Sequence, residues 1–341
     1  MGTQNWKKRG WWVVALVWLS EWSFAQSLER FSFAEPHLGT IVELTIYAPD
    51  QTVANEAART AFARVKQLDR IFSDYKPDSE AMRLCDEAGT GRAIKVSSEL
   101  FTVLKAAVTV SEQTDGAFDV TVGTLVQLWR RARKEKRLPT SNQIVVAKEL
   151  VGWKLVVLNE LEQSVELKRA GMRLDFGGIA KGFIAQDVSR LLRERGFERT
   201  LVAVAGDIVA GDSPPSADGW KVAVAPLRGV DKAPSRLLLL KHRAISTSGD
   251  AFQFVEIDGV RYSHIVDPKT GLGLTRRSSV TIVADDGIIA DALATAICVI
   301  GPGRGMTLIE ENPSLAALIV QANDDGVELI ESKGFRLHEV K

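Results

Sequence analysis

The chain of 341 residues has only two cysteines and four histidines, and it has no net charge, because 43 lysines and arginines balance 43 aspartates and glutamates. Two cysteines cannot build the disulfide framework of a small secreted domain, and Cys85 and Cys298 are predicted to be buried packing residues. The balanced charge argues against a nucleic-acid partner. The one basic block, WRRARKEKR at 129–137, is predicted to form a solvated helix face.

Several common catalytic motifs are absent from the sequence. There is no H-E-x-x-H, C-x-x-C or G-x-S-x-G pattern, which removes zincins, thioredoxin-like redox proteins and α/β-hydrolases as strong candidates. The segment GPGRGMT, residues 301–307, has the glycines of a phosphate-binding loop but lacks its G-K-[ST] ending. We expect this segment to cap the preceding helix instead.

The N-terminal segment has the order of charged and apolar residues that is typical of a signal peptide. NWKKRG is positively charged, WWVVALVWL is apolar, and Ser23 and Ala25 occupy the −3 and −1 positions of a cleavage site. The apolar run is shorter than the about 20 residues of a transmembrane helix, and no cysteine follows it to carry a lipid anchor. We therefore expect a signal peptide at 1–25 and an exported, periplasmic protein, soluble after cleavage, formed by residues 26–341.

Hydrophobic periodicity after this segment predicts an α/β fold. Apolar residues make up 45% of the chain, enough for a large core. Helical spacing occurs in 53–72, in 97–113 after a serine cap, and from the DFGG segment to Gly196. Apolar runs typical of strands lie at 39–48, 200–211, 220–227, 236–246, 279–286 and 315–322. Asp258-Gly259 between two alternating runs predicts a β-hairpin. Without a long linker, we expect a single two-lobed domain with mixed sheets and flanking helices.

Two segments offer groups suited to a phosphate and a metal ion. In DFGGIAKG, residues 175–182, paired glycines precede a helix whose N–H groups could approach an anion, and Lys181 lies in its first turns. In DALAT, Asp291 and Thr295 lie four apart on one helix face and are hard oxygen ligands suited to Mg²⁺. The structural alternatives are a common strand-to-helix turn for the first segment, and backbone-bonded helix residues for the second.

Two further segments carry side chains that simple packing does not require. DGAFD, residues 115–119, is a glycine turn with an aromatic ring and a carboxylate, which could hold a flat heterocycle or form a tight connection. RYSHIVDPKTG, residues 261–271, places His264 near Ser263 and Asp267, any of which could handle a proton. The structural alternative is a hydrogen-bonded histidine at a strand end.

Taken in order, these segments resemble those of the ApbE family, the FAD:protein FMN transferases. The matching segments are HLGT, FSDYKPDSEAMRL, DGAFDVTVGTLV, LDFGGIAKGF, AGDI, AISTSGD, RYSHIVDPKTG and ADALATA, and the resemblance runs from about Glu35 to Lys341. It implies a T-fold-like α/β fold that binds FAD with Mg²⁺. It also implies transfer of the FMN half of FAD to a threonine hydroxyl of another protein, with release of AMP.

The resemblance assigns roles to residues as well. The nucleotide contacts that it implies are Leu38, Tyr75, Ala117, Phe118, Asp119, Asp175, Lys181, His264 and Ile265. The implied metal ligands are the carbonyl of Gly178, Asp291 and Thr295, with Ala294 offering only a carbonyl where some members have a second aspartate. The acceptor hydroxyl must lose a proton, and His264 is the side chain whose pKa best suits that task, with Asp267 able to orient it. Many members have Met in place of Leu38 and Asn in place of Cys85.

Three functions are compatible with these residues. The leading hypothesis is FMN transfer to an exported or membrane-bound acceptor protein, expected to be a redox flavoprotein, because this chain has no good copy of the family's acceptor motif. The second is FAD pyrophosphatase activity, in which water replaces threonine and the products are FMN and AMP. The third is a non-catalytic periplasmic FAD-binding protein.

Overall fold

The computed structural model describes residue 1 and residues 27–224, 236–249, 253–323 and 326–340. The predicted signal peptide at 1–25 therefore lies outside the described residues, except for Met1. Within the part of the chain that the structure describes, no helix combines the length and apolarity needed to cross a membrane.

The centre of the molecule is an eight-stranded sheet whose neighbouring strands are all antiparallel. In order across the sheet the strands are β1 (Glu29–His37), β2 (Thr40–Ala48), β6 (Thr200–Val204), β7 (Asp207–Ala210), β10 (Arg243–Gly249), β13 (Ser278–Ala284), β14 (Ala316–Asn323) and β15 (Gly326–Glu331). The middle strands β7 and β10 are therefore flanked on both sides, which makes them a rigid base for side chains at their ends.

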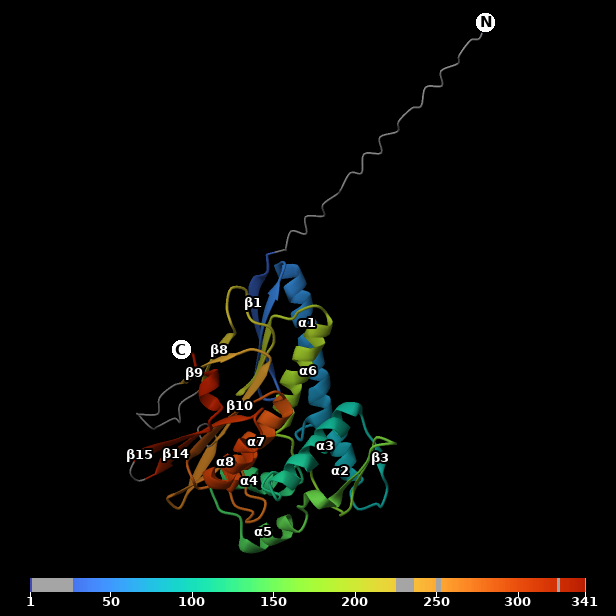
Figure 1. The fold of residues 1–341 in the computed structure, drawn as a ribbon. Coiled ribbons are helices and arrows are strands. Elements are labelled where there is room, and N and C mark those ends of the chain that lie inside the picture. The colour runs from blue at the N-terminus through green and yellow to red at the C-terminus, as the bar shows by residue number, and fades with distance from the viewer. Residues whose placement is uncertain (2–26, 225–235, 250–252, 324–325, 341) are drawn as a thin grey trace.

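One face of this sheet is covered by helices, as Figure 1 shows. The helices packed on it or on each other are α1 (Gln51–Phe72), α2 (Glu80–Asp86), α3 (Ser98–Gln113), α6 (Ala180–Glu194), α7 (Gly287–Ile300) and α8 (Pro302–Glu310). The helix α6 contacts β6 and β7, and α7 contacts β10 and β13 as well as α6. The pair α6 and α7 thus lies directly over the middle of the sheet.

The other face of the sheet is covered by a two-stranded hairpin. This hairpin pairs β8 (Trp220–Val224) with β9 (Arg236–Leu240) and is joined by the short helix η2 (Phe335–His338). Because both faces are covered, all seven residues of β13 are buried, without the alternation of a strand that faces water. Val280 and Ile282 belong to the core on the helical side, and Val283 belongs to the core shared with Trp220.

A smaller lobe has a core of its own. It is formed by α4 (Gly123–Glu135), α5 (Ser141–Lys148) and the hairpin of β11 (Phe254–Ile257) and β12 (Val260–Ser263). Its core contains Leu125, Trp129, Ala132, Ala147, Val255, Ile257 and Val266. A third small sheet, with η1 (Trp153–Leu155) beside it, orders β3 (Ile94–Lys95), β5 (Ser164–Leu167) and β4 (Val156–Asn159).

The two lobes meet at the segment that follows β12. Ile265 belongs to the main core, whereas its neighbour Val266 belongs to the core of the small lobe. The Trp129 indole donates a hydrogen bond of 2.8 Å to the carbonyl of Gly271, which ties the end of this segment to α4. His264 therefore lies one residue before the chain passes from one core to the other.

Most elements that periodicity predicts are present. Ser97 caps α3 by accepting from the N–H of Leu100, and the predicted hairpin turns at Asp258 and Gly259, with φ of 51° and 76°. The runs at 200–211 and 236–246 are each two strands rather than one. Gly301 ends α7 as expected, but the residues after it open a new helix, α8.

Candidate active site

Lys181, in the first turn of α6, is surrounded by oxygen atoms. Its Nζ lies 2.8 Å from the carbonyl oxygen of Gly177, 3.1 Å from Oδ2 of Asp207 and 3.1 Å from Oδ2 of Asp291. Asp291 lies in α7 and Asp207 begins β7, so three separate elements meet at this ammonium group. We call the oxygen donors of Gly177, Asp207 and Asp291 the oxygen cradle.

Two glycines allow α6 and α7 to approach closely enough to form the cradle. A methyl group at Gly182 would overlap the carbonyl oxygen of Gly287, and a methyl at Gly287 would overlap that of Gly182. The N–H of Gly182 donates to Oδ2 of Asp291 at 3.1 Å. Close packing thus brings the Asp291 carboxylate to the start of α6, where the helix dipole also favours a negative charge.

The cradle has two carboxylates for one ammonium group. Asp291 is 1% exposed and Asp207 is 3% exposed. Burial and then the neighbouring Asp207 raise the pKa of Asp291 to about 7, although Lys181 acts in the opposite direction. Burial lowers the pKa of Lys181, but the two carboxylates outweigh it and leave that pKa raised. This excess of negative charge attracts a further cation.

The predicted metal ligands Gly178, Asp291 and Thr295 are brought together. A methyl group at Gly178 would lie 2.7 Å from Oγ1 of Thr295, so the backbone of Gly178 passes close to the Thr295 hydroxyl. The Thr295 hydroxyl also lies 3.1 Å from the Ser248 hydroxyl. Ala294, in contrast, is fully buried in the middle of α7, where its carbonyl belongs to the helical hydrogen-bond ladder.

The chemistry of this donor set fits Mg²⁺. Carboxylate, hydroxyl and carbonyl oxygens are hard ligands, and Mg²⁺ is commonly held by one or two carboxylates and completed by water and phosphate oxygens. Among the described residues, no group of three or more His, Cys, Asp or Glu side chains could hold a metal ion by itself. The arrangement therefore suits a cation whose coordination is completed by oxygen atoms of a substrate.

A second charged cluster lies where α4 passes the DFGG segment. Arg130 forms ion pairs with Asp74 and, at 3.2 Å, with Oδ2 of Asp175, and its guanidinium carbon lies 4.2 Å from the centre of the Tyr75 ring. Asp175 also accepts from the N–H of Gly177 at 2.9 Å. Burial and then Asp74 raise the pKa of Asp175. Tyr75 is 75% exposed, so it offers an aromatic face beside these charges.

This cluster corrects the interpretation of the basic block at 129–137. The prediction that the block is a solvated helix face is wrong for Arg130, which is half-buried and bound to two carboxylates. Trp129 and Ala132 are buried in the small lobe, whereas Arg131 and Lys134 are exposed.

The DGAFD segment is a tight connection whose side chains point inward. Ala117 and Phe118 are buried, and Asp119 accepts hydrogen bonds from the hydroxyl and N–H of Thr121 and from the N–H of Trp153, at 2.6, 2.8 and 2.9 Å. Burial raises the pKa of Asp119, and these hydrogen bonds oppose the rise. The side chains of Ala117, Phe118 and Asp119 thus stabilise the connection, and their predicted nucleotide contacts stay a prediction.

His264 directly follows β12 and is partly exposed. Its Nδ1 lies 3.1 Å from the carbonyl oxygen of Gln253. Since a carbonyl can only accept, Nδ1 carries the proton, and Nε2 of the neutral ring is free to accept one. Burial, followed by the charges of Arg133 and Lys181, lowers the pKa of His264 to about 4, although the Gln253 carbonyl raises it.

The structure gives Asp267 hydrogen-bond partners other than His264. The Asp267 carboxylate accepts from the N–H of Lys269 at 2.8 Å and from the hydroxyl of Thr270 at 3.1 Å, so it stabilises its own turn. The Gln253 carbonyl bonds the His264 ring instead.

Leu38 lies at the same end of the sheet as the cradle. It occupies the turn between β1 and β2, with φ of 55°, and packs partly against the main core. The N–H of Ala205 donates to the carbonyl of Ile41 at 3.3 Å, which joins this end of β2 to the turn before Asp207.

Sequence reasoning missed Asp207 as a member of the site. Asp207 accepts a hydrogen bond from the Ser246 hydroxyl and pairs with Lys181. The available signal was the AGDI segment, in which a carboxylate follows a glycine turn between two apolar strands.

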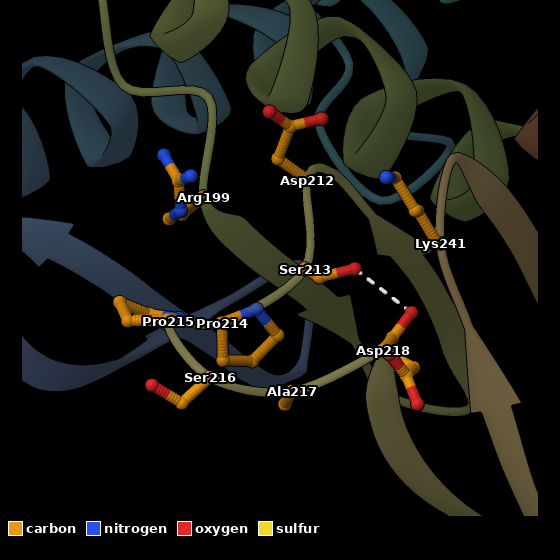
Figure 2. Close-up of a pocket in the computed structure, with 9 residues that line it drawn as sticks. All are labelled: Arg199, Asp212, Ser213, Pro214, Pro215, Ser216, Ala217, Asp218 and Lys241. Atoms are coloured by element: carbon orange, nitrogen blue, oxygen red, sulfur yellow. Dashed lines mark hydrogen bonds between the residues drawn. The ribbon is translucent and has the colours of Figure 1, made fainter.

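A separate hollow of about 300 Å³ lies elsewhere on the molecule (Figure 2). It is lined by Arg199, Lys241 and the segment Asp212–Asp218, within which the Ser213 hydroxyl donates to the carbonyl of Asp218 at 2.9 Å. No residue predicted for the site lines this hollow.

Comparison with known proteins identifies the family. The sequence model of the ApbE family matches residues 38–319, which include all of the oxygen cradle. The chain belongs to the ApbE family. A FAD:protein FMN transferase from Treponema pallidum (strain Nichols) is 31% identical to it, over 86% of this chain and 85% of its own length.

Solved ApbE structures share the fold. The flavin transferase ApbE from Vibrio cholerae superimposes with a TM-score of 0.81 at 29% identity, covering 91% of this chain and 99% of its own. The flavinyl transferase ApbE of Pseudomonas stutzeri gives 0.81 at 27% identity, covering 91% and 97%. The predicted α/β fold with helix-flanked sheets is confirmed, and so is the resemblance to the ApbE family. The expectation of mixed sheets is wrong, because every pair of neighbouring strands in the described residues is antiparallel.

Proposed function

We propose that this protein transfers the FMN half of FAD to a threonine hydroxyl of an acceptor protein, with Mg²⁺ bound and AMP released. The observation that carries the proposal is the oxygen cradle, which is built on segments that lie within the match to the ApbE family. Relatives named FAD:protein FMN transferases support the reaction class.

The residues that would hold Mg²⁺ are Asp291, Thr295 and the backbone of Gly178, with Asp207 adding negative charge nearby. Bound there, the ion would neutralise charge on the diphosphate of FAD. Lys181, whose Nζ lies in the cradle, would be the protein's own cation for the same phosphate oxygens.

The transfer exchanges one phosphorus–oxygen bond for another. The threonine oxygen forms a bond to the phosphorus of the FMN half, the bond from that phosphorus to the bridging oxygen breaks, and AMP leaves with that oxygen. The hydroxyl proton passes to Nε2 of His264, which the hydrogen bond to Gln253 leaves free to accept it. Tyr75, exposed beside Arg130, would pack against the nucleotide.

The decisive experiment incubates the protein with FAD, Mg²⁺ and a candidate threonine acceptor. The expected result is flavin fluorescence that stays with the acceptor on a denaturing gel, together with AMP in equal amount. AMP without labelled acceptor would identify a pyrophosphatase, and FAD binding without AMP would identify a carrier; either result contradicts the transferase.

We also propose that the protein works outside the cytoplasm, where an exported or membrane-bound redox flavoprotein would be its acceptor. The support is the signal-like order of charged, apolar and small residues at 1–25. N-terminal sequencing of the protein from a periplasmic fraction should begin at Gln26, and recovery of the uncleaved chain in the cytosol would contradict export.

A further inference from the structure

The basic block of α4 contains two half-buried arginines one turn apart. Arg130 and Arg133 are three residues apart, which places them on the same side of the helix. The guanidinium of Arg130 is fully engaged, because it pairs with Asp74 and Asp175 and stacks on Tyr75. No carboxylate of this cluster is left unpaired for Arg133.

Arg133 forms no hydrogen bond or ion pair with any described residue, although its side chain is half-buried. Arg131, between the two, is exposed to solvent and unconstrained. Withdrawing a guanidinium from water without a partner costs free energy, which a bound anion would recover. An arginine is well suited to this role, because its planar donors match two phosphate oxygens at once.

The surroundings of Arg133 are residues of the proposed site. Burial and then Arg130 lower the pKa of Arg133, while Tyr75 and Asp175 act on it in the opposite direction. The charges of Arg133 and Lys181 both act on His264. Arg133 lies on the same side of α4 as Arg130, which contacts Asp175 and Tyr75, so it faces the candidate site from the small lobe.

We propose that Arg133 is a phosphate-binding residue of this enzyme, a second cation for the dinucleotide in addition to Lys181. The proposal rests on the proposed function, since it takes FAD as the anionic ligand. Lys181 reaches the substrate from α6 in the main domain, whereas Arg133 reaches it from the small lobe. The diphosphate would therefore be held from both lobes.

The test compares Arg133→Met with Arg131→Met, which removes the same charge from an exposed position on the same helix. The measurement is the Kd of FAD from flavin fluorescence, without acceptor. We expect Arg133→Met to raise the Kd about tenfold, the equivalent of about 1.4 kcal/mol, and Arg131→Met to leave it within about twofold. Riboflavin, which has no phosphate, should bind both variants as it binds the wild type.

Two outcomes would overturn the proposal directly. Equal weakening by Arg131→Met and Arg133→Met would show a general charge effect. An unchanged Kd in Arg133→Met with slower labelling of the acceptor would assign Arg133 to the partner protein instead. If Arg133→Met melts at a lower temperature, Arg133→Lys decides, because it retains the charge and should recover part of the affinity. Failure of the wild type to bind FAD would contradict the proposed function itself.

Discussion

At the scale of single residues, Asp291 is the side chain whose loss should reduce activity most. It is the carboxylate that both Lys181 and the N–H of Gly182 contact, and its burial leaves no solvent to replace it. We expect Asp291→Ala to lose about 3 kcal/mol or more of transition-state stabilisation, the scale of one strong electrostatic contact. Thr295→Ala should lose less, because water can replace a neutral hydroxyl.

Rates of AMP release at saturating FAD and Mg²⁺ measure both variants. Near-normal turnover of Asp291→Ala would contradict the metal assignment. A larger loss for Thr295→Ala than for Asp291→Ala would show that the hydroxyl, through Ser248, does more than fill a ligand position.

The lowered pKa of His264 predicts a pH dependence of the transfer rate that differs from that of an unperturbed histidine. An unperturbed imidazole would lose its capacity as a base below about pH 6.5. Here burial lowers the pKa of His264 to about 4, so the ring stays neutral at lower pH. Because only the neutral ring accepts a proton, the contribution of His264 should persist from pH 8 to pH 5 and decline only as the pH approaches 4. Saturating Mg²⁺ keeps Asp291, whose pKa is raised to about 7 in the metal-free protein, in its ionised form during this measurement.

The matched variants are His264→Ala and His264→Asn, with FAD saturating. His264→Ala should stop transfer while FAD still binds. An Asn variant that keeps the wild-type rate across this pH range would mean that His264 only bonds the carbonyl of Gln253.

At the scale of elements, the crossing of α6 and α7 holds the site together. A side chain at Gly182 has no space, because Gly287 and the Cβ of Asp291 lie against it. Gly182→Ala should therefore destabilise the fold by about 1–3 kcal/mol, as overpacking does. Gly303→Ala in α8 is the control, since nothing lies within 4 Å of its Cβ position, and alanine is the better helix former.

Urea unfolding curves of the two variants measure the difference. Equal midpoints for Gly182→Ala and Gly303→Ala would show that α6 and α7 can separate without cost. In that case the cradle would not depend on their close contact.

The sequence pattern predicted those elements that depend on interactions between neighbouring residues. The cap at Ser97 and the Asp258-Gly259 turn depend on neighbouring residues, so the sequence was sufficient for them. The basic block was misinterpreted because the carboxylates that bind Arg130 are Asp74 and Asp175, 56 and 45 positions away. The grouping of Asp207 with Asp291 also depends on tertiary packing, and no spacing rule predicts it.

At the scale of the whole molecule, the site lies where the main domain and the small lobe meet. The main domain contributes the cradle and Tyr75, and the chain near His264 connects the two cores through Ile265 and Val266. The order of the segments predicted the ApbE family, and the family model confirms that membership. It did not predict that α4 of the small lobe places Arg130 against Asp175.

The position of Lys181 has a consequence for the metal-free protein. The ammonium acts as a built-in counter-ion: without any metal, it already offsets much of the repulsion between Asp207 and Asp291. Stripping the ion with a chelator should therefore leave the fold intact, and an arriving Mg²⁺ must compete with a tethered charge. In Lys181→Met that competitor is gone, so the gap between melting temperatures in Mg²⁺ and in EDTA should widen. An unchanged gap would mean that Mg²⁺ and the Lys181 ammonium do not bind the same carboxylate oxygens. A wider gap would mean that Lys181 neutralises the two carboxylates of the metal-free enzyme until Mg²⁺ and the substrate bind.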